Sequence, residues 1–124
     1  MVNIKENLER IVQRIKSAAL RVGRRAEEVR LVAVTKTVEL AALQEALACG
    51  VGIFGENRVQ EAMPKIQQLG RGHEKIIWHF VGHLQTNKAK QVVGRFAMLH
   101  AVDSERLGTE LDRRADAKGV ASVP

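Results

Sequence analysis

The sequence has few aromatic residues and almost no cysteine. It contains no tyrosine, one tryptophan, three phenylalanines and one cysteine among 124 residues. The single cysteine excludes a disulfide within the chain, so an apolar core must hold the fold together. No apolar run reaches the length of a membrane span or has the flanks of a secretion signal. We therefore expect a cytoplasmic protein with no membrane partner.

The chain is basic. Twenty lysines and arginines against fourteen acidic residues give a formal net charge of +6. Such a charge suits a polyanionic partner, and three arginines within residues 21–25 strengthen that interpretation. Because aromatic side chains that stack on bases are scarce, a solvated basic surface explains the charge better. We expect no nucleic-acid partner, and a basic interaction module stays an alternative.

Hydrophobic spacing predicts an N-terminal helix over residues 3–22, ended by Gly23. Four units follow, each a strand and then a helix. The predicted strands cover residues 31–36, 51–54, 75–81 and 97–102, and the predicted helices cover residues 39–48, 56–69, 86–93 and 105–118. Gly55 is expected to open a turn, and Ser104 to cap the last helix, which Gly119 ends. Pro64 should kink or divide the third of the five predicted helices.

Four consecutive strand and helix units with short connections require parallel strands, so the fold class is α/β. A doubly wound sheet and a (β/α) barrel both fit this pattern. Neither a Rossmann glycine fingerprint nor a phosphate-loop motif follows the first strand. Residues 122–124 stand where a fifth strand would begin, and four units are half of an eight-stranded TIM barrel. We therefore expect the first four β/α units of such a barrel, preceded by an additional N-terminal helix.

Reactive groups collect at the carboxyl ends of the strands in both architectures. The polar groups expected there are Lys36 and residues 55–58, 79–85 and 100–104. A partly desolvated lysine favours its neutral amine, which can attack an aldehyde to form a Schiff base. Lys36 is therefore a candidate imine-forming lysine. From position alone, the simpler interpretation is that Lys36 turns its ammonium to water.

The neighbouring polar residues have structural alternatives. Asn57 is placed to cap a helix, and Glu56 to complement the helix dipole. His79 stands inside a predicted strand, where a lone histidine is more often a hydrogen-bonded core residue than a catalyst. Gly82 fits a turn that a side chain would block.

The sequence gives little support for a metal site. Metal ligands usually occur at close, regular spacings, and the four-residue step from His79 to His83 crosses a strand end, so these two side chains should not face one way. The other candidate ligands are His73, His100 and Cys49.

Four motifs, LVAVTK, FGENRVQEA, WHFVGHLQTNK and HAVDS, occur in this order. In order and spacing they resemble the pyridoxal phosphate homeostasis proteins (the YggS/PROSC family), from the N-terminal helix to the last residue. The resemblance implies one domain like the barrel domain of alanine racemase, with residues 1–124 as its N-terminal half. It also implies pyridoxal 5'-phosphate as the cofactor, held as a Schiff base on Lys36, with Asn57 and His79 lining the ring.

The resemblance implies a protein that holds, buffers or hands over the cofactor without robust turnover. PLP-dependent apo-enzymes are the implied recipients. Because the chain lacks the tyrosine that would serve as a second acid/base group, binding is favoured over a racemase-like enzyme, which is the alternative.

In the family, late glycine- and serine-rich segments grip the cofactor phosphate, and an arginine near the pyridine nitrogen also comes late. These 124 residues contain neither. We therefore expect either a piece of a longer protein or self-association of two half-barrels, since open sheet edges tend to pair.

Overall fold

The computed structural model describes residues 3–70 and 75–124 of the chain. The chain divides into two compact units. The smaller unit comprises Met1–Leu31 and Glu39–Val51, and the larger unit comprises Val32–Val38 and Gly52–Pro124. No helix in residues 3–70 or 75–124 is long and apolar enough to cross a bilayer.

The smaller unit is helical. It contains α1 (Ile4–Arg21), a 3-10 helix η1 (Ala26–Glu28) and α2 (Leu40–Ala48), and α1 contacts both of the others. The side chain of Asn3 caps α1 by accepting the Glu6 N–H at 3.0 Å. The predicted boundaries of α1 and α2 are confirmed to within one residue. The apolar stripe of α1 is only partly covered, because Ile11 and Val12 are exposed while Ala19 is buried.

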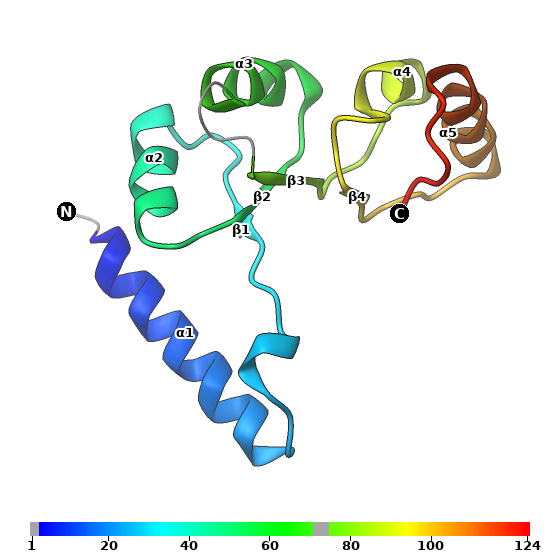
Figure 1. Ribbon diagram of the computed structural model, residues 1–124. Helices are drawn as coiled ribbons and strands as arrows, with labels where there is room; N and C mark the ends of the chain where they lie inside the picture. The colour runs from blue at the N-terminus through cyan, green and yellow to red at the C-terminus, as the bar shows by residue number, and fades with distance from the viewer. Residues whose placement is uncertain (1–2, 71–74) are drawn as a thin grey trace. The chain divides into compact units, whose positions relative to one another are not determined.

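The larger unit contains a four-stranded sheet. Its strands are β1 (Ala33–Val34), β2 (Ile53–Glu56), β3 (Ile77–Phe80) and β4 (Met98–Leu99), all parallel and in the order β1-β2-β3-β4 (Figure 1). The predicted α/β class with parallel strands is confirmed. Strands β1, β3 and β4 are shorter than the apolar runs that predicted them, whereas β2 has the predicted length and lies two residues later. Beyond β4, the Leu99 N–H donates to the Pro124 carbonyl at 2.9 Å, so the chain after the last helix runs beside β4.

The pairing register assigns side chains to the two faces of the sheet. Val34 pairs with Gly55, Gly55 with His79, and His79 with Met98. Paired residues point to the same face, and neighbours along a strand point to opposite faces. We call the face with Val34, His79 and Met98 the open face.

The opposite face, which we call the packed face, carries the core. Phe54 and Trp78 are register partners whose rings lie 5.4 Å apart, and Phe80 meets Phe96 edge-on at the same distance. Helices α3 (Val59–Gly70) and α4 (Ala89–Val92) lie on one side of β2 and β3 (Figure 1). These aromatic side chains are at most 7% exposed.

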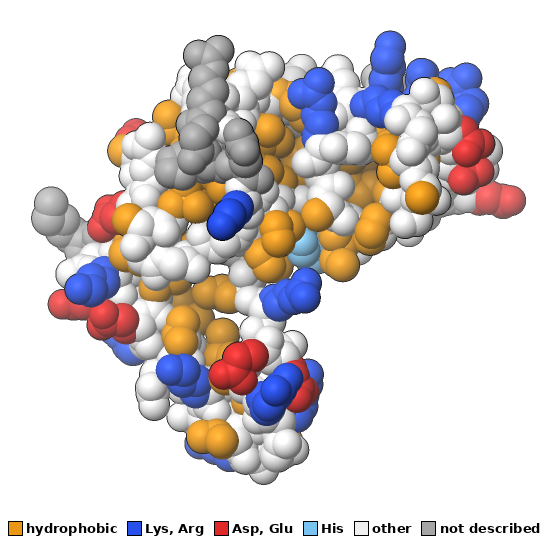
Figure 2. All heavy atoms as spheres, viewed as in Figure 1, with side chains coloured by type: hydrophobic (Ala, Val, Ile, Leu, Met, Phe, Trp, Pro, Cys, Tyr) orange, Lys and Arg blue, Asp and Glu red, His pale blue; other side chains and the backbone are white. Residues whose placement is uncertain are grey.

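The open face is apolar and uncovered within the described residues. Val34 is 50% exposed, Ile77 40% and Met98 41%. Figure 2 shows hydrophobic side chains gathered around the strands with a histidine among them. The larger unit therefore presents apolar side chains of this sheet face to water.

The last helix matches its prediction closely. Helix α5 spans Glu105–Lys118, and its N-cap Ser104 accepts the Leu107 N–H at 3.1 Å. Its buried residues are Leu107, Leu111 and Ala115, and Gly119 ends it with a φ of 70°. The predicted helix over 86–93 is divided into a 3-10 helix, η2 (Thr86–Lys88), and the short α4.

The turn predicted at Gly55 is wrong. Gly55 and Glu56 both belong to β2, and α3 begins three residues later than predicted, at Val59. A Cβ on Gly55 would lie 2.9 Å from Val81 Cγ1 and 3.1 Å from Val32 Cγ1. Glycine is needed here because side chains of the two adjacent strand segments close over the backbone, and not because the chain turns.

Pro64 does not divide α3, contrary to one predicted outcome. The helix continues from Val59 to Gly70 through the proline. Proline removes only the bond from its own position to the carbonyl of Gln60, and Gln60 is an exposed residue.

Candidate cofactor-binding site

Lys36, Asn57 and His79 lie at the carboxyl ends of three neighbouring strands. Lys36 comes two residues after β1, Asn57 directly after β2, and His79 is the penultimate residue of β3. His79 points to the open face by its register with Gly55. Thr35 is buried whereas Lys36, the next residue, is exposed. The sheet thus brings an amine, a carboxamide and an imidazole to one edge.

The side chain of Lys36 is exposed in the described structure. The expected partial desolvation is therefore not present among these residues, because the open face beside it is uncovered. Lys36 lies in a tight turn in which the Val38 N–H donates to the Thr35 carbonyl at 3.0 Å. The next residue, Thr37, has a φ of 61°, and its hydroxyl donates to the Lys36 carbonyl at 2.6 Å.

Asn57 is not the N-cap of α3. The Ala62 N–H donates to the carbonyl of Arg58 at 2.9 Å, so Arg58 occupies the capping position. Asn57 instead packs against the chain after β3. A Cβ on Gly82 would lie 2.7 Å from the Asn57 Cβ and 3.2 Å from its Cα. Gly82 therefore permits a close approach that holds Asn57 at the strand ends.

His79 forms a pair with a histidine from the next strand. Its Nδ1 lies 3.0 Å from Nε2 of His100, and the two ring centroids are 5.1 Å apart. The His100 N–H donates to the Phe80 carbonyl at 2.9 Å, which fixes His100 at the end of β4. One imidazole must donate and the other accept, so the pair can pass a proton between them. The sequence placed His100 at a strand end, but only the β3–β4 register joins it to His79.

His79 and His83 do not form a common metal site, because they contact different partners. The Nδ1 of His83 lies 3.1 Å from an Asp103 carboxylate oxygen, while His79 meets His100. Within residues 3–70 and 75–124, no group of three or more His, Cys, Asp or Glu side chains is arranged to hold a metal ion. His73, the remaining histidine, lies outside the described residues.

A buried ion pair lies beneath the Lys36 turn, on the packed face. Glu56 is 1% exposed and Lys65 9%, and the Lys65 Nζ lies 2.6 Å from Glu56 Oε1. In the described part of the chain neither Glu56 oxygen has a hydrogen-bond partner of suitable geometry, so the contact is purely an ion pair. The sequence predicted that Glu56 complements a helix dipole, and Lys65 was not among the predicted site residues. The available signal was spacing, because Lys65 shares the helix face of Ala62 and Leu69, three residues before it and four after.

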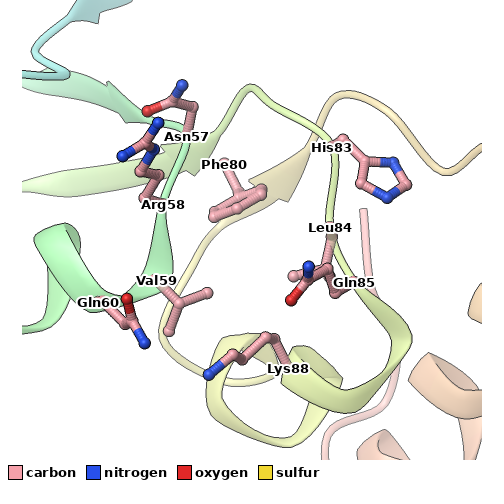
Figure 3. Close-up of a pocket in the computed structure, with 9 residues that line it drawn as sticks. All are labelled: Asn57, Arg58, Val59, Gln60, Phe80, His83, Leu84, Gln85 and Lys88. Carbon is pink, nitrogen blue, oxygen red and sulfur yellow. The ribbon is translucent and has the colours of Figure 1, made fainter.

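A groove of about 380 Å³ opens between the first turn of α3 and the segment after β3 (Figure 3). Its apolar floor is formed by Val59, Phe80 and Leu84, and Asn57 lies at its edge. Lys88 and Gln60 extend toward one another across it. The remaining lining residues are Arg58, His83 and Gln85. The groove contains cations and amides but no acidic side chain, so it favours anions.

No family model matches the chain, but several curated proteins to which it is similar share one name. The pyridoxal phosphate homeostasis protein of Synechocystis sp. is 48% identical over 88 residues, which are 71% of this chain and 40% of that protein. The protein of the same name from Escherichia coli K12 is 40% identical over 119 residues, which are 95% of this chain and 51% of that protein.

Solved structures show the same relationship. PipY of Synechococcus elongatus PCC7942, solved with PLP bound, is 41% identical with a TM-score of 0.76, over 94% of this chain and 50% of PipY. A protein of unknown function from Bifidobacterium adolescentis is 34% identical with a TM-score of 0.86, over 94% of this chain and 51% of that one.

The fold and the site define an α/β protein whose parallel strands end in an amine, a carboxamide and paired imidazoles. The comparisons confirm the predicted family relationship, and the chain is a relative of the pyridoxal phosphate homeostasis proteins. It spans about half the length of the curated relatives it matches.

Proposed function

We propose that the chain is the N-terminal half of a (β/α)8 barrel that binds pyridoxal 5'-phosphate through Lys36. The observation that carries this proposal is the placement of Lys36, Asn57 and His79 at the ends of three adjacent parallel strands. The PLP-bound state of the structurally similar PipY supports the choice of ligand. The Leu99 bond to Pro124 supports a further strand position beside β4, as a barrel requires.

The residues present fit this cofactor. PLP supplies an aldehyde and an electron-withdrawing ring, and an exposed primary amine at a strand end is the group that would hold that aldehyde as a Schiff base. Asn57 follows the strand beside that of the amine, and His79 lies on the strand after that, so both are on one side of the amine and would line the ring. Lys65 is a poor competitor because it is buried, pairs with Glu56 and donates to the Thr35 carbonyl at 2.8 Å.

In this proposal the protein is not an enzyme. It holds the cofactor in reserve and releases it to PLP-dependent apo-enzymes, which amounts to intracellular PLP homeostasis. The names of the curated relatives support this role. Two copies of the chain would associate through their open faces, since apolar sheet faces of this kind seldom stay exposed.

Reductive labelling tests the binding site. The chain is mixed with PLP, its absorbance is recorded before and after borohydride reduction, and the modified lysine is located by peptide mapping. We expect stable label on Lys36 and its loss in Lys36→Ala, while the matched variant Lys88→Ala keeps it. Label spread evenly over several lysines, or label that survives Lys36→Ala, would show that the proposal is wrong.

The second candidate function is a racemase-like enzyme, and the His79–His100 pair is the observation that favours it. This pair offers an acid/base group at the same end of the sheet as Lys36, and the chain has no tyrosine for that role. We expect no alanine racemisation above the rate with free cofactor. Saturable racemisation that requires both Lys36 and His100 would reverse our preference for binding over catalysis.

A further inference from the structure

Lys65 joins three segments of the larger unit under the Lys36 turn. Its ammonium donates to the Thr35 carbonyl at the end of β1 at 2.8 Å, and it lies 2.6 Å from Glu56 at the end of β2. It also donates to Glu61, one helical turn earlier in α3, at 3.3 Å. A buried ammonium is stable only when its donors are satisfied, so these contacts hold its position firmly.

Glu61 extends this network to the residue after Lys36. Its Oε1 accepts both the Lys65 ammonium and the backbone N–H of Thr37. The Thr37 N–H bond is the largest cause of a lowered pKa for the Glu61 carboxyl, with the Lys65 ammonium contributing in the same direction. A left-handed conformation is unfavourable for a β-branched residue such as Thr37 and persists only where its surroundings impose it.

The two residues that flank Lys36 are therefore held by the same pair of side chains. Lys65 binds the carbonyl of Thr35, and Glu61 binds the N–H of Thr37, so the Lys36 backbone is held on both sides. Lys36 itself is exposed and takes no part in this network among the described contacts.

We propose that Lys65 and Glu61 are positioning residues that fix the turn carrying Lys36 and so set the direction of its amine. The inference about the cofactor rests on the proposed function, whereas the inference about the turn does not. An amine held in place reacts with an aldehyde more readily than one on a mobile turn, because less conformational freedom is lost on reaction. The network lies on the packed face and reaches Lys36 through the backbone of its two neighbours, Thr35 and Thr37.

The test uses Glu61→Ala and, separately, the double variant Glu56→Gln with Lys65→Met, which removes the buried ion pair without leaving one charge unpaired. The matched control is Glu110→Ala, because Glu110 is also a helical glutamate of similar exposure, 22% against 29% for Glu61, and pairs with Arg113 and Arg114. Hydrogen exchange of the Thr37 amide gives a readout that needs no cofactor. Selectivity of borohydride-trapped PLP for Lys36 over other lysines gives the second.

We expect Glu61→Ala to speed Thr37 exchange by about tenfold or more while exchange in β2 is unchanged. The double variant alters Glu56 of β2 itself, so it should speed Thr37 exchange while exchange in α5 is unchanged. The selectivity of borohydride-trapped PLP for Lys36 over other lysines should fall about threefold or more. Glu110→Ala should change neither. Unchanged Thr37 exchange in Glu61→Ala would overturn the proposal, as would a rise shared equally by β2, because that would show a purely structural contribution. If the unmodified chain shows no selectivity for Lys36, the proposed function fails, and Thr37 exchange still decides the positioning.

Discussion

At the scale of the residue, two positions control the candidate site without carrying its chemistry. Gly82 packs against Asn57, and Glu61 holds the Thr37 N–H beside Lys36. Gly82 contacts a proposed cofactor ligand directly, and Glu61 holds the backbone next to one. Their substitution should therefore change the site more than the fold.

Gly82→Ala should displace Asn57. The added Cβ would lie 2.7 Å from the Asn57 Cβ, closer than such atoms approach in folded proteins, so the backbone must shift. We expect a loss of about 1–3 kcal/mol in the free energy of unfolding, measured by denaturant titration. We also expect weaker PLP binding, measured by titration with the cofactor. Gly108→Ala is the control, because that helical position has open space and alanine there should stabilise by about 0.5–1 kcal/mol. Equal effects of the two substitutions would contradict this assignment.

Acid should release the Lys36 turn. The pKa of the Glu61 carboxyl is lowered from its ordinary value in the folded chain, chiefly by the Thr37 N–H and also by Lys65 and Arg58. A lowered folded pKa gives stability that is present above the unfolded value and is lost as the pH falls through the folded value. Thr37 amide protection should therefore fall as the pH drops below the ordinary range of a glutamate and through the lowered pKa of Glu61.

Glu61→Gln should remove most of this pH dependence of Thr37 protection. Glu110→Gln, which alters another glutamate with a lowered pKa, should preserve it. Amide exchange followed by NMR across the acid range measures both variants. If Thr37 protection still falls with pH in Glu61→Gln, a group other than Glu61 causes the pH dependence.

At the scale of the element, α5 shows how local sequence fixes a boundary. Ser104 has an extended backbone with φ −148° and ψ 151°, and its hydroxyl satisfies the Leu107 N–H. Ser104→Ala should cost about 1 kcal/mol, because that donor loses its partner at the helix start. Ser17→Ala, at an exposed position inside α1, should be neutral or slightly stabilising. Thermal unfolding of both variants provides the comparison, and equal melting temperatures would contradict the capping role.

At the scale of the whole molecule, the open face should govern association. It presents Val34, Ile77 and Met98 to water, and burying apolar surface stabilises by about 25 cal/mol per Å². We expect the chain to self-associate at micromolar concentration, as seen by light scattering, and Ile77→Lys to shift it toward monomer. Leu20→Lys, at an apolar α1 position that is 76% exposed, should have little effect. A stable monomer at this concentration would contradict the association.

The sequence by itself determined the order of elements and the residues at the strand ends. Strand and helix periods depend on neighbours a few residues apart, so the parallel α/β class, the cap at Ser104 and the position of Lys36 were predictable. The strand conformation of Gly55 was not predicted, because glycine has the same local signature in a turn and in a crowded strand. In that case the deciding contacts came from Val32 and Val81, which lie far away in sequence.

Only the tertiary structure decided which polar groups meet. The β3–β4 register joins His79 to His100, and packing of α3 on the sheet brings Lys65 to Glu56 and to the Thr35 carbonyl. These pairs are separated by 21, 9 and 30 residues. No local rule specifies them, because a register shift of one residue would send every side chain of a strand to the opposite face. The sequence therefore identifies the candidate amine, whereas the network that holds its turn follows from the packing of α3 against β1 and β2.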